Sequence, residues 1–400
     1  MKKKLLTITL SLTLLLAGCV QEDGAAAPPP STAAPTISTQ ESSPSQPEEK
    51  GPLALMDVSS TDWSGIRGKI RGIHSAGNGK VLILADQLNL YDTVSGENIT
   101  APVEALEAIY CRCWAFDSGY VVAGFPSAPE DDGDTAPQLR VIFYDTDLKK
   151  TSELDWSKLL DDGDEIITQQ ALDFSSDGSR IVYATLSGLY LYDLPQQKRS
   201  MLLDPTAEDR ASISRIAGVE QVGFTNGDKS VAFRATSLAV PAVPGQKSFD
   251  TTGMIHTDGS GFTNEKMSGY AAKKLIAYDS RLLIAEDFVT TTGRIMTIDS
   301  KSGERNIFNL SDSKEGGNIY GSDNGRYFAS SLQAQDGWTV RVYDAETGKQ
   351  LKEQFVSNDG REEYGYNDPI FCVLDETRAC VVYMGRRQTG VPTKVEVISF

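Results

Sequence analysis

Histidine and cysteine, which most often ligate metals or act as bases and nucleophiles near neutral pH, are scarce in this chain. The 400 residues include two histidines, His74 and His256, and five cysteines. There is no HExxH, GxSxG, P-loop or GxGxxG motif, and the GNGK string at Gly77 is typical of a hairpin turn. We therefore expect no metal, no cofactor and no recognisable catalytic centre, with both histidines packed or on the surface.

Two acidic strings, at residues 130–134 and 160–166, raise the question of calcium binding. A calcium loop needs several oxygen ligands at a defined spacing. Neither string has the alternating acids of a regular calcium loop, so we interpret both as solvated acidic turns.

Large aromatic residues and arginines on the face of the domain expected to carry the longer loops are the remaining candidates for ligand contact, because these residue types are enriched at binding hot spots. They are Trp156, Phe249, Trp338, Arg361, Tyr364, Tyr366, Arg386 and Arg387. For each aromatic alone, packing under its own loop is an equally good explanation. As a set they predict a binding surface.

One cysteine lies in a different context. Three lysines precede an uncharged apolar run at residues 5–17, which is too short to span a bilayer and is laid out like a secretory signal. The run ends in the string LLAGC, with Cys19 last, which resembles the bacterial lipobox. The resemblance implies that residues 1–18 are a lipoprotein signal peptide and that Cys19 carries the lipid. An ordinary signal with an incidental cysteine is the alternative.

The other four cysteines fall into two pairs. Cys111 and Cys113 stand two apart in an expected strand, where a mutual disulfide would strain the backbone, so we expect free buried thiols. Cys372 and Cys380 flank an expected hairpin turn. We predict a cross-strand disulfide between them, which an oxidising compartment would permit; free thiols are the alternative.

The net charge and composition of the chain exclude some classes of binding partner. Lys and Arg number 38 against 55 Asp and Glu, a net charge of -17, which excludes general attraction to nucleic acid or to anionic lipid. Removal of the signal peptide makes the chain more acidic still, so lipid rather than charge would hold it at the bacterial cell membrane, or at the outer membrane of a diderm host. Residues 19–51 are rich in Pro, Ser, Thr and Ala and predict a disordered tether.

Residues 52–400 show apolar alternation bounded by Gly, Asp and Asn, which predicts an all-β domain. A strand-end pattern of an apolar residue, Asp and a turn recurs six times, from Tyr91, Tyr144, Tyr192, His256, Ile298 and Tyr343. The Asp carboxylate can accept hydrogen bonds from backbone N–H groups two residues on, and Gly supplies a positive φ. The pattern therefore closes a hairpin.

A second hairpin signal precedes most of these turns and is best formed in FSSDGSRIVYA from Phe174. Related strings start at Phe116, Phe224 and Gly321, and weaker ones at Ser75, Ile276 and Val373. Each unit reads as four strands, a to d, and resembles one blade of the WD40-like and YVTN-type β-propellers. The resemblance implies a seven-bladed propeller over residues 52–400; six or eight blades stay open, because the second and fourth units are irregular.

The last unit ends in strand c, at residues 395–400, and lacks a strand d. Residues 53–58 also show alternating apolar residues and have no neighbouring segment expected to pair with them as a strand. We predict that the two segments pair and cover the edge of the last unit.

In such a propeller the a–b and c–d turns share one face and the b–c and d–a loops share the other. The long segments are all of the second kind: b–c at 127–138, 238–252 and 386–392, and d–a at 155–168, 204–218 and 357–368. Binding residues concentrate on loops held by a rigid scaffold. We therefore predict a lipid-anchored, extracytoplasmic, non-catalytic scaffold for an envelope protein or glycan. The alternatives are a lactonase-like or glycan-active enzyme, with its site at the central opening of this face, and a sensor domain for a small molecule or cation.

Overall fold

All residues that the structure describes belong to one unit, Lys50–Phe400. The computed structural model describes residues 56–57, 66, 70, 72–102, 111–125, 138–166, 168–204, 214–239, 249–266, 272–277, 281–286, 294–309, 319–321, 325–334, 337–357, 370–383 and 394–400. The predicted signal peptide, Cys19 and the tether lie outside these ranges and stay predictions.

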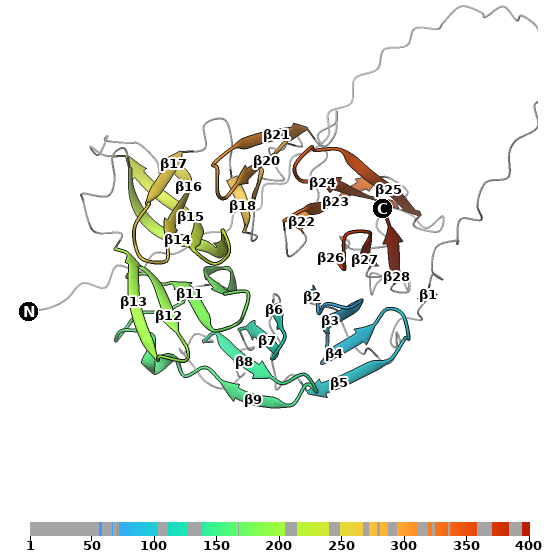
Figure 1. The fold of residues 1–400 in the computed structure, drawn as a ribbon, viewed down its shortest axis with the longest axis horizontal. Helices are drawn as coiled ribbons and strands as arrows, with labels where there is room; N and C mark the ends of the chain where they lie inside the picture. The colour runs from blue at the N-terminus through green and yellow to red at the C-terminus, as the bar shows by residue number, and fades with distance from the viewer. Residues whose placement is uncertain are drawn as a thin grey trace, which may run out of the picture. The chain divides into compact units, whose positions relative to one another are not determined.

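The described residues form an all-β fold, as the alternating pattern predicts (Figure 1). They make seven antiparallel sheets of four strands each, with two short 3-10 turns, η1 (Trp156–Lys158) and η2 (Gln169–Ala171). The first three sheets are β2 (Gly72–Ser75), β3 (Lys80–Leu84), β4 (Gln87–Asp92), β5 (Asn98–Pro102); β6 (Cys111–Phe116), β7 (Gly119–Gly124), β8 (Arg140–Tyr144), β9 (Lys150–Glu153); and β10 (Leu172–Phe174), β11 (Arg180–Ala184), β12 (Leu189–Asp193), β13 (Lys198–Leu203). Among the described residues, no helix has the length and apolar character needed to cross a membrane.

The remaining sheets follow the same order along the chain. The fourth to sixth are β14 (Ser214–Thr225), β15 (Ser230–Ala239), β16 (Phe249–His256), β17 (Thr263–Lys266); β18 (Ala272–Ala277), β19 (Arg281–Glu286), β20 (Arg294–Asp299), β21 (Arg305–Asn309); and β22 (Ile319–Gly321), β23 (Tyr327–Ala334), β24 (Gly337–Asp344), β25 (Gln350–Ser357). The seventh combines β26 (Ile370–Val373), β27 (Arg378–Tyr383) and β28 (Lys394–Ser399) with β1 (Met56–Asp57).

The seventh sheet brings distant parts of the sequence together. Met56 pairs with Val395 and Asp57 with Lys394, so a segment from the start of the domain lies beside its last strand. The predicted pairing of residues 53–58 with 395–400 is confirmed for these residues; 53–55 and 58 lie outside the described ranges. The added strand covers the edge of β28 with backbone hydrogen bonds.

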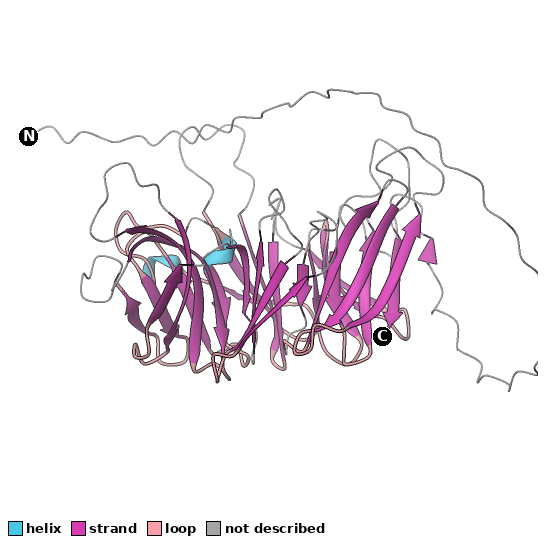
Figure 2. Ribbon diagram, turned by 90° about the horizontal axis from the view of Figure 1, so that it is seen from above, coloured by secondary structure: helices cyan, strands magenta, loops and turns pink. Residues whose placement is uncertain are grey.

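Tight turns at one end of the sheets use the chemistry expected from the repeat. Asp92 Oδ1 accepts hydrogen bonds from the N–H groups of Val94, at 2.8 Å, and Ser95, at 3.0 Å. Asp344 does the same for Glu346 and Thr347, at 2.9 and 2.8 Å. Figure 2 shows that most of the described turns lie at one end of the strands. The Asp carboxylates at this end thus stabilise the turns, as predicted.

Neighbouring sheets pack through their first strands. Strand β2 contacts β6 and β26, β10 contacts β14, β14 contacts β18, and β22 contacts β26. Buried aromatic residues, among them Trp114, Phe174, Tyr183 and Phe233, fill the second to fourth sheets as one cluster. Burial of apolar surface is the dominant favourable contribution to the free energy of folding.

A buried carboxylate joins the same three sheets. Trp114 Nε1 donates to Asp173 Oδ1 at 2.8 Å, Arg112 donates to the same oxygen at 3.2 Å, and the Phe224 N–H donates to Asp173 Oδ2 at 2.8 Å. Burial raises the pKa of Asp173, and Arg112 and the donated hydrogen bonds oppose that shift. The side chain therefore links β6, β10 and β14.

Candidate functional site

The two ends of the sheets differ, and each needs a name. We call the end with the connections between first and second and between third and fourth strands the turn end, and the opposite end the loop end. Among the described strands, β14 and β15 of the fourth sheet are the longest: β14, β15 and β16 have 12, 10 and 8 residues, against 3, 5 and 5 for β10, β11 and β12. Because β14 and β15 already pair up to the tight turn at Thr225 and Ser230, the extra length lies at the loop end.

Two irregularities shape the extended part of β14. Its register against β15 shifts between Ile216 and Gly218 and again between Val219 and Gln221. The second shift leaves Glu220 without a paired residue on β15. Such bulges re-aim side chains and are frequent beside functional sites. Here the bulge brings Glu220 onto the face of the sheet that carries Arg234.

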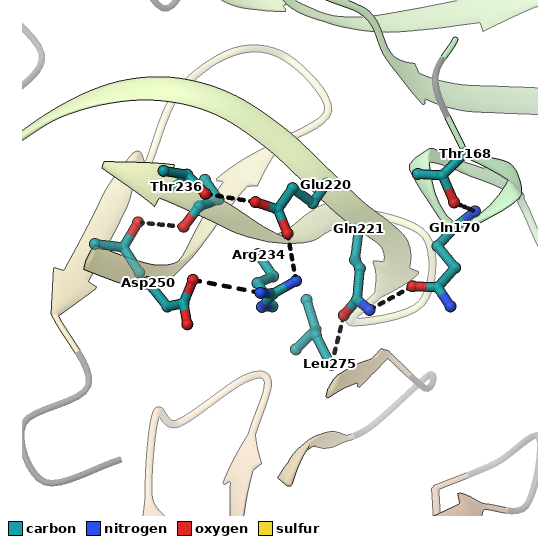
Figure 3. A network of polar contacts seen from close by, with 10 residues as sticks. Thr168, Gln170, Glu220, Gln221, Arg234, Thr236, Asp250 and Leu275 are labelled. Atoms are coloured by element: carbon teal, nitrogen blue, oxygen red, sulfur yellow. Dashed lines mark hydrogen bonds and ion pairs between the residues drawn. The ribbon is translucent and has the colours of Figure 1, made fainter. Parts of the chain in front are cut away.

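Four side chains of the extended sheet form what we call the Arg234 cluster (Figure 3). Arg234, whose side chain is 8% exposed, donates to Glu220 Oε2 at 2.6 Å and to Asp250 Oδ1 at 3.3 Å. The Thr236 hydroxyl donates to Glu220 Oε1. The buried guanidinium thus orients two carboxylates that come from different strands.

An amide bridge lies next to this cluster and reaches both neighbouring sheets (Figure 3). Gln221 Nε2 donates to Gln170 Oε1 at 2.5 Å, and the Leu275 N–H donates to Gln221 Oε1 at 2.7 Å. Gln170 belongs to η2, which Thr168 caps by accepting the Gln170 N–H at 3.3 Å. Gln221 is buried and Gln170 exposed, so the bridge ends at the surface.

This arrangement suits ligand recognition, because Arg234 holds the hydrogen-bond acceptors of Glu220 and Asp250 in fixed positions. The Glu220 and Asp250 side chains are 36% and 22% exposed. Both bind one guanidinium, so neither is placed as a free general acid or base. Within the described ranges, no three His, Cys, Asp or Glu side chains gather closely enough to hold a metal ion.

The aromatic residues proposed from the sequence have contacts inside the fold. Trp156 Nε1 donates to the Leu139 carbonyl at 2.7 Å, and its ring lies edge-on to Tyr183 at 6.2 Å. Trp338 is 6% exposed and packs in the core shared by the sixth and seventh sheets. Phe249 begins β16, directly before Asp250, and is half-buried. The ligand roles of these three residues stay predictions.

The other proposed contact residues lie outside the described ranges. They are Arg361, Tyr364, Tyr366, Arg386 and Arg387.

The acidic string at 160–166 folds onto the third sheet. Arg199 donates to both oxygens of Asp161, at 2.9 and 2.8 Å, and the Tyr183 hydroxyl donates to the Leu159 carbonyl at 2.6 Å. Asp162 and Glu165 are exposed. This segment is a docked acidic turn, while residues 130–134 lie outside the described ranges.

The cysteines and one histidine are packed within the sheets. Cys372 lies directly opposite Cys380 in the β26–β27 pair, as expected for cross-strand neighbours. Both side chains are buried, and burial raises the pKa of Cys380 to about 12; the disulfide stays a prediction. Cys111 and Cys113 are likewise buried. His256 Nδ1 lies 2.8 Å from the buried Ser230 hydroxyl.

Comparison with known proteins does not assign the site. No family model and no curated protein matches the chain. The Arg234 cluster therefore has to be interpreted from its own geometry.

The sequence analysis did not single out Glu220, Arg234 or Asp250. A signal is present nonetheless: Arg234 interrupts an apolar run that extends from Val231 to Ala235. A charged residue at such a position needs a partner, because an unpaired buried charge is costly.

Proposed function

We propose that the domain is a seven-bladed β-propeller, with each four-stranded sheet as one blade. Three observations support this: seven such sheets among the described residues, contacts between the first strands of several neighbouring sheets, and the pairing of Met56 and Asp57 with β28. In a propeller that pairing would close the ring by hydrogen bonds between the two ends of the domain.

We further propose that the protein is a lipid-anchored, extracytoplasmic, non-catalytic scaffold that binds an envelope protein or glycan at its loop end. The observation that carries this proposal is the difference between the two ends. Turn-end carboxylates such as Asp92 and Asp344 are occupied by their own backbone, whereas the fourth sheet extends at the loop end and presents Glu220 and Asp250. Fixed acceptors on a rigid sheet suit recognition.

Attachment of the protein to the membrane through Cys19 is part of the same proposal. The chain carries a net charge of -17, so electrostatic attraction to an anionic membrane cannot hold it in place. Lipid on Cys19 would supply the affinity instead. Replacing Cys19 with Ala should release the protein into the soluble fraction, and unchanged detergent-phase partitioning would contradict the anchor.

Site-specific cross-linking tests the scaffold proposal. A photoreactive amino acid is placed at the exposed loop-end residue Gln170, or at the exposed turn-end residue Lys301 as a matched control, in the full-length protein. We expect cross-links to an envelope component from position 170. Cross-links from position 301 alone, or from neither, would contradict the proposal, and turnover of a lactone or glycan by purified protein would replace it with the enzyme alternative.

A further inference from the structure

We propose that Cys372 and Cys380 form a disulfide bond that holds the first strand of the seventh sheet in place, so that this sheet reaches its full stability only after oxidation. The proposal goes beyond the proposed function and rests on it in one respect: an extracytoplasmic location would supply oxidising conditions. Its basis is the register of two strands and the surroundings of the two side chains.

The two cysteines lie directly opposite each other. In the antiparallel pair of β26 and β27, Cys372 has Cys380 as its partner. Directly opposite residues of such a pair have Cα atoms about 4.5–5.5 Å apart, and their side chains lie on one face of the sheet. Disulfides join residues whose Cα atoms are about 4.4–6.8 Å apart. The backbone therefore places the two side chains within the range of a disulfide.

A tight turn fixes this register. The Leu374 N–H donates to the Arg378 carbonyl at 2.9 Å. Asp375 Oδ1 accepts the Thr377 N–H at 2.9 Å, and Asp375 Oδ2 accepts from the Arg378 guanidinium at 2.8 and 2.6 Å. The Phe400 N–H, directly after β28, donates to the Thr377 carbonyl at 2.9 Å. Because a slip by one residue would move the facing side chains to opposite faces, these bonds keep the two cysteines together.

The surroundings of the pair disfavour other roles for it. Cys372 and Cys380 are 5% and 0% exposed, in a core cluster of aliphatic and aromatic residues. Reactive and metal-binding cysteines act as thiolates, which positively charged groups or a metal favour. Burial instead raises the pKa of Cys380 to about 12. A disulfide needs no charged sulfur in the folded domain and so fits this apolar setting.

Cys111 and Cys113 provide a contrast within the same chain. Both are buried as well, but they lie two residues apart along β6, and neither has a cysteine as its partner on β7. Residues so spaced in a strand have Cα atoms about 6.6 Å apart and side chains that run side by side. This second pair is therefore not expected to bond, and it serves as an internal control.

The position of β26 gives the bond its consequence. Strand β26 contacts β2 and β22 of the neighbouring sheets, and it pairs with β27, which pairs with β28. Strand β28 in turn pairs with β1, from the start of the domain. A covalent link between β26 and β27 restricts the unfolded chain and so stabilises the sheet in which both ends of the domain meet.

Oxidation of the pair needs an electron acceptor, and the disulfide of a small thiol or of a thiol oxidoreductase is the suitable class. One cysteine thiolate attacks the acceptor's disulfide and releases a thiol, which leaves a mixed disulfide. The second cysteine attacks this mixed disulfide and releases the other thiol, so two electrons and two protons pass to the acceptor. Because both side chains are buried in the folded domain, the reaction takes place before folding is complete.

Peptide mapping of the full-length protein tests the bond directly. The protein is reduced in urea, refolded in neutral detergent with reduced and oxidised glutathione, labelled with N-ethylmaleimide in urea and digested with trypsin without reduction. Cleavage after Arg378 separates the two cysteines into peptides 362–378 and 379–386, and cleavage after Arg112 separates the control pair. We expect 362–378 to be joined to 379–386 and both control cysteines to be labelled.

Thermal unfolding tests the effect of the bond on the fold. Protein refolded with the glutathione mixture is compared with protein refolded and kept in reductant, for the wild type, Cys380→Ala and Cys111→Ala. The wild type and Cys111→Ala should unfold about 2 °C or more higher when oxidised. Cys380→Ala should have one midpoint in both conditions, because its loss of packing does not depend on oxidation. Circular dichroism confirms that each variant is folded.

Labelled thiols at both 372 and 380 after refolding with glutathione, or equal midpoints of the oxidised and reduced wild type, would overturn the proposal. The location is tested separately, on protein labelled directly as it is isolated from cells. Labelled thiols at both positions in that sample, with the bond present after refolding, would contradict the extracytoplasmic location and leave the disulfide standing.

Discussion

The third and fourth sheets use charged side chains in opposite ways. In the third, Asp173 is 9% exposed, and its oxygens accept hydrogen bonds from Trp114 and Arg112 of the second sheet and from Phe224 of the fourth. In the fourth, the buried charge is the cation Arg234, and its carboxylate partners are partly exposed.

This difference between the two sheets indicates which charged residues can be changed to test binding without unfolding the domain. An acid that is nearly enclosed, with a donor on each oxygen, joins sheets, and its loss leaves the donors unpaired. Acids that surround a buried cation at the edge of a sheet hold that cation in common, so one of them can be neutralised without exposing a buried charge. We therefore expect Asp173 to control folding and Asp250 to control binding.

The largest effect should follow Asp173→Ala. The change removes the acceptor for Trp114 Nε1 and the Phe224 N–H and leaves Arg112 without its carboxylate. Breaking a buried pair by removing one partner costs about 3 kcal/mol or more. Urea unfolding followed by tryptophan fluorescence measures the loss.

The contrast between Asp173 and Asp250 would be contradicted if Asp250→Asn destabilised the fold as much as Asp173→Ala does. That variant keeps the Arg234–Glu220 pair, and Asn can still accept a hydrogen bond, so we expect a loss within about 0.5 kcal/mol. Equal destabilisation by Asp173→Ala and Asp250→Asn would show that both clusters serve the fold alone.

An intermediate effect should separate the turn end from the loop end. Gly348 has φ 68° in a turn-end hairpin, and a Cβ there would collide with the ring of Phe308. Gly218, on the extended part of β14, has no atom within 4 Å of the position of a Cβ. Gly348→Ala should therefore cost about 1–2 kcal/mol, and Gly218→Ala should stay within about 0.5 kcal/mol.

Thermal unfolding of both variants tests this expectation. A lower midpoint for Gly218→Ala than for Gly348→Ala would contradict the view that the turn end is the structurally constrained end of the sheets.

Local rules explain which parts of this molecule could be predicted from its sequence. The Asp turns and strand alternation depend on neighbours within a few residues, so the hairpins at Asp92 and Asp344 and the all-β class follow from the sequence. The pairing of Met56 with Val395 was also predictable, because each segment lacked a partner. That prediction needed only the rule that the unpaired backbone groups of an edge strand have to be covered.

The Arg234 cluster could not be predicted in the same way. It depends on a bulge at Glu220 and on register between β14, β15 and β16, which decides which polar residues share a face. The proposed Trp156 contact shows the reverse difficulty: residue type favoured a hot spot, while packing against Tyr183 and the Leu139 carbonyl depends on tertiary structure.

The smallest expected effect is the loss of stability at low pH through the turn-end carboxylate of Asp177. Hydrogen bonds from the Ser175 hydroxyl, and from the N–H and hydroxyl of Ser179, lower the pKa of Asp177 to about 2. A carboxyl group whose pKa is lower in the folded chain than in the unfolded chain, about 3.9, stabilises the fold fully above the unfolded value. Its contribution is lost as the pH falls through about 2.

The free energy of unfolding should therefore fall with acid between about pH 4 and pH 2, and part of that slope should be missing in Asp177→Asn, because asparagine does not titrate. Urea unfolding of the full-length chain at several pH values across this window measures the slope. Asp162→Asn is the control for the change in net charge, since Asp162 is exposed and accepts no hydrogen bond from described residues. Identical slopes for wild type and Asp177→Asn would mean that the turn-end carboxylates do not stabilise the fold through their hydrogen bonds, and the contrast between the two ends would lose its physical basis.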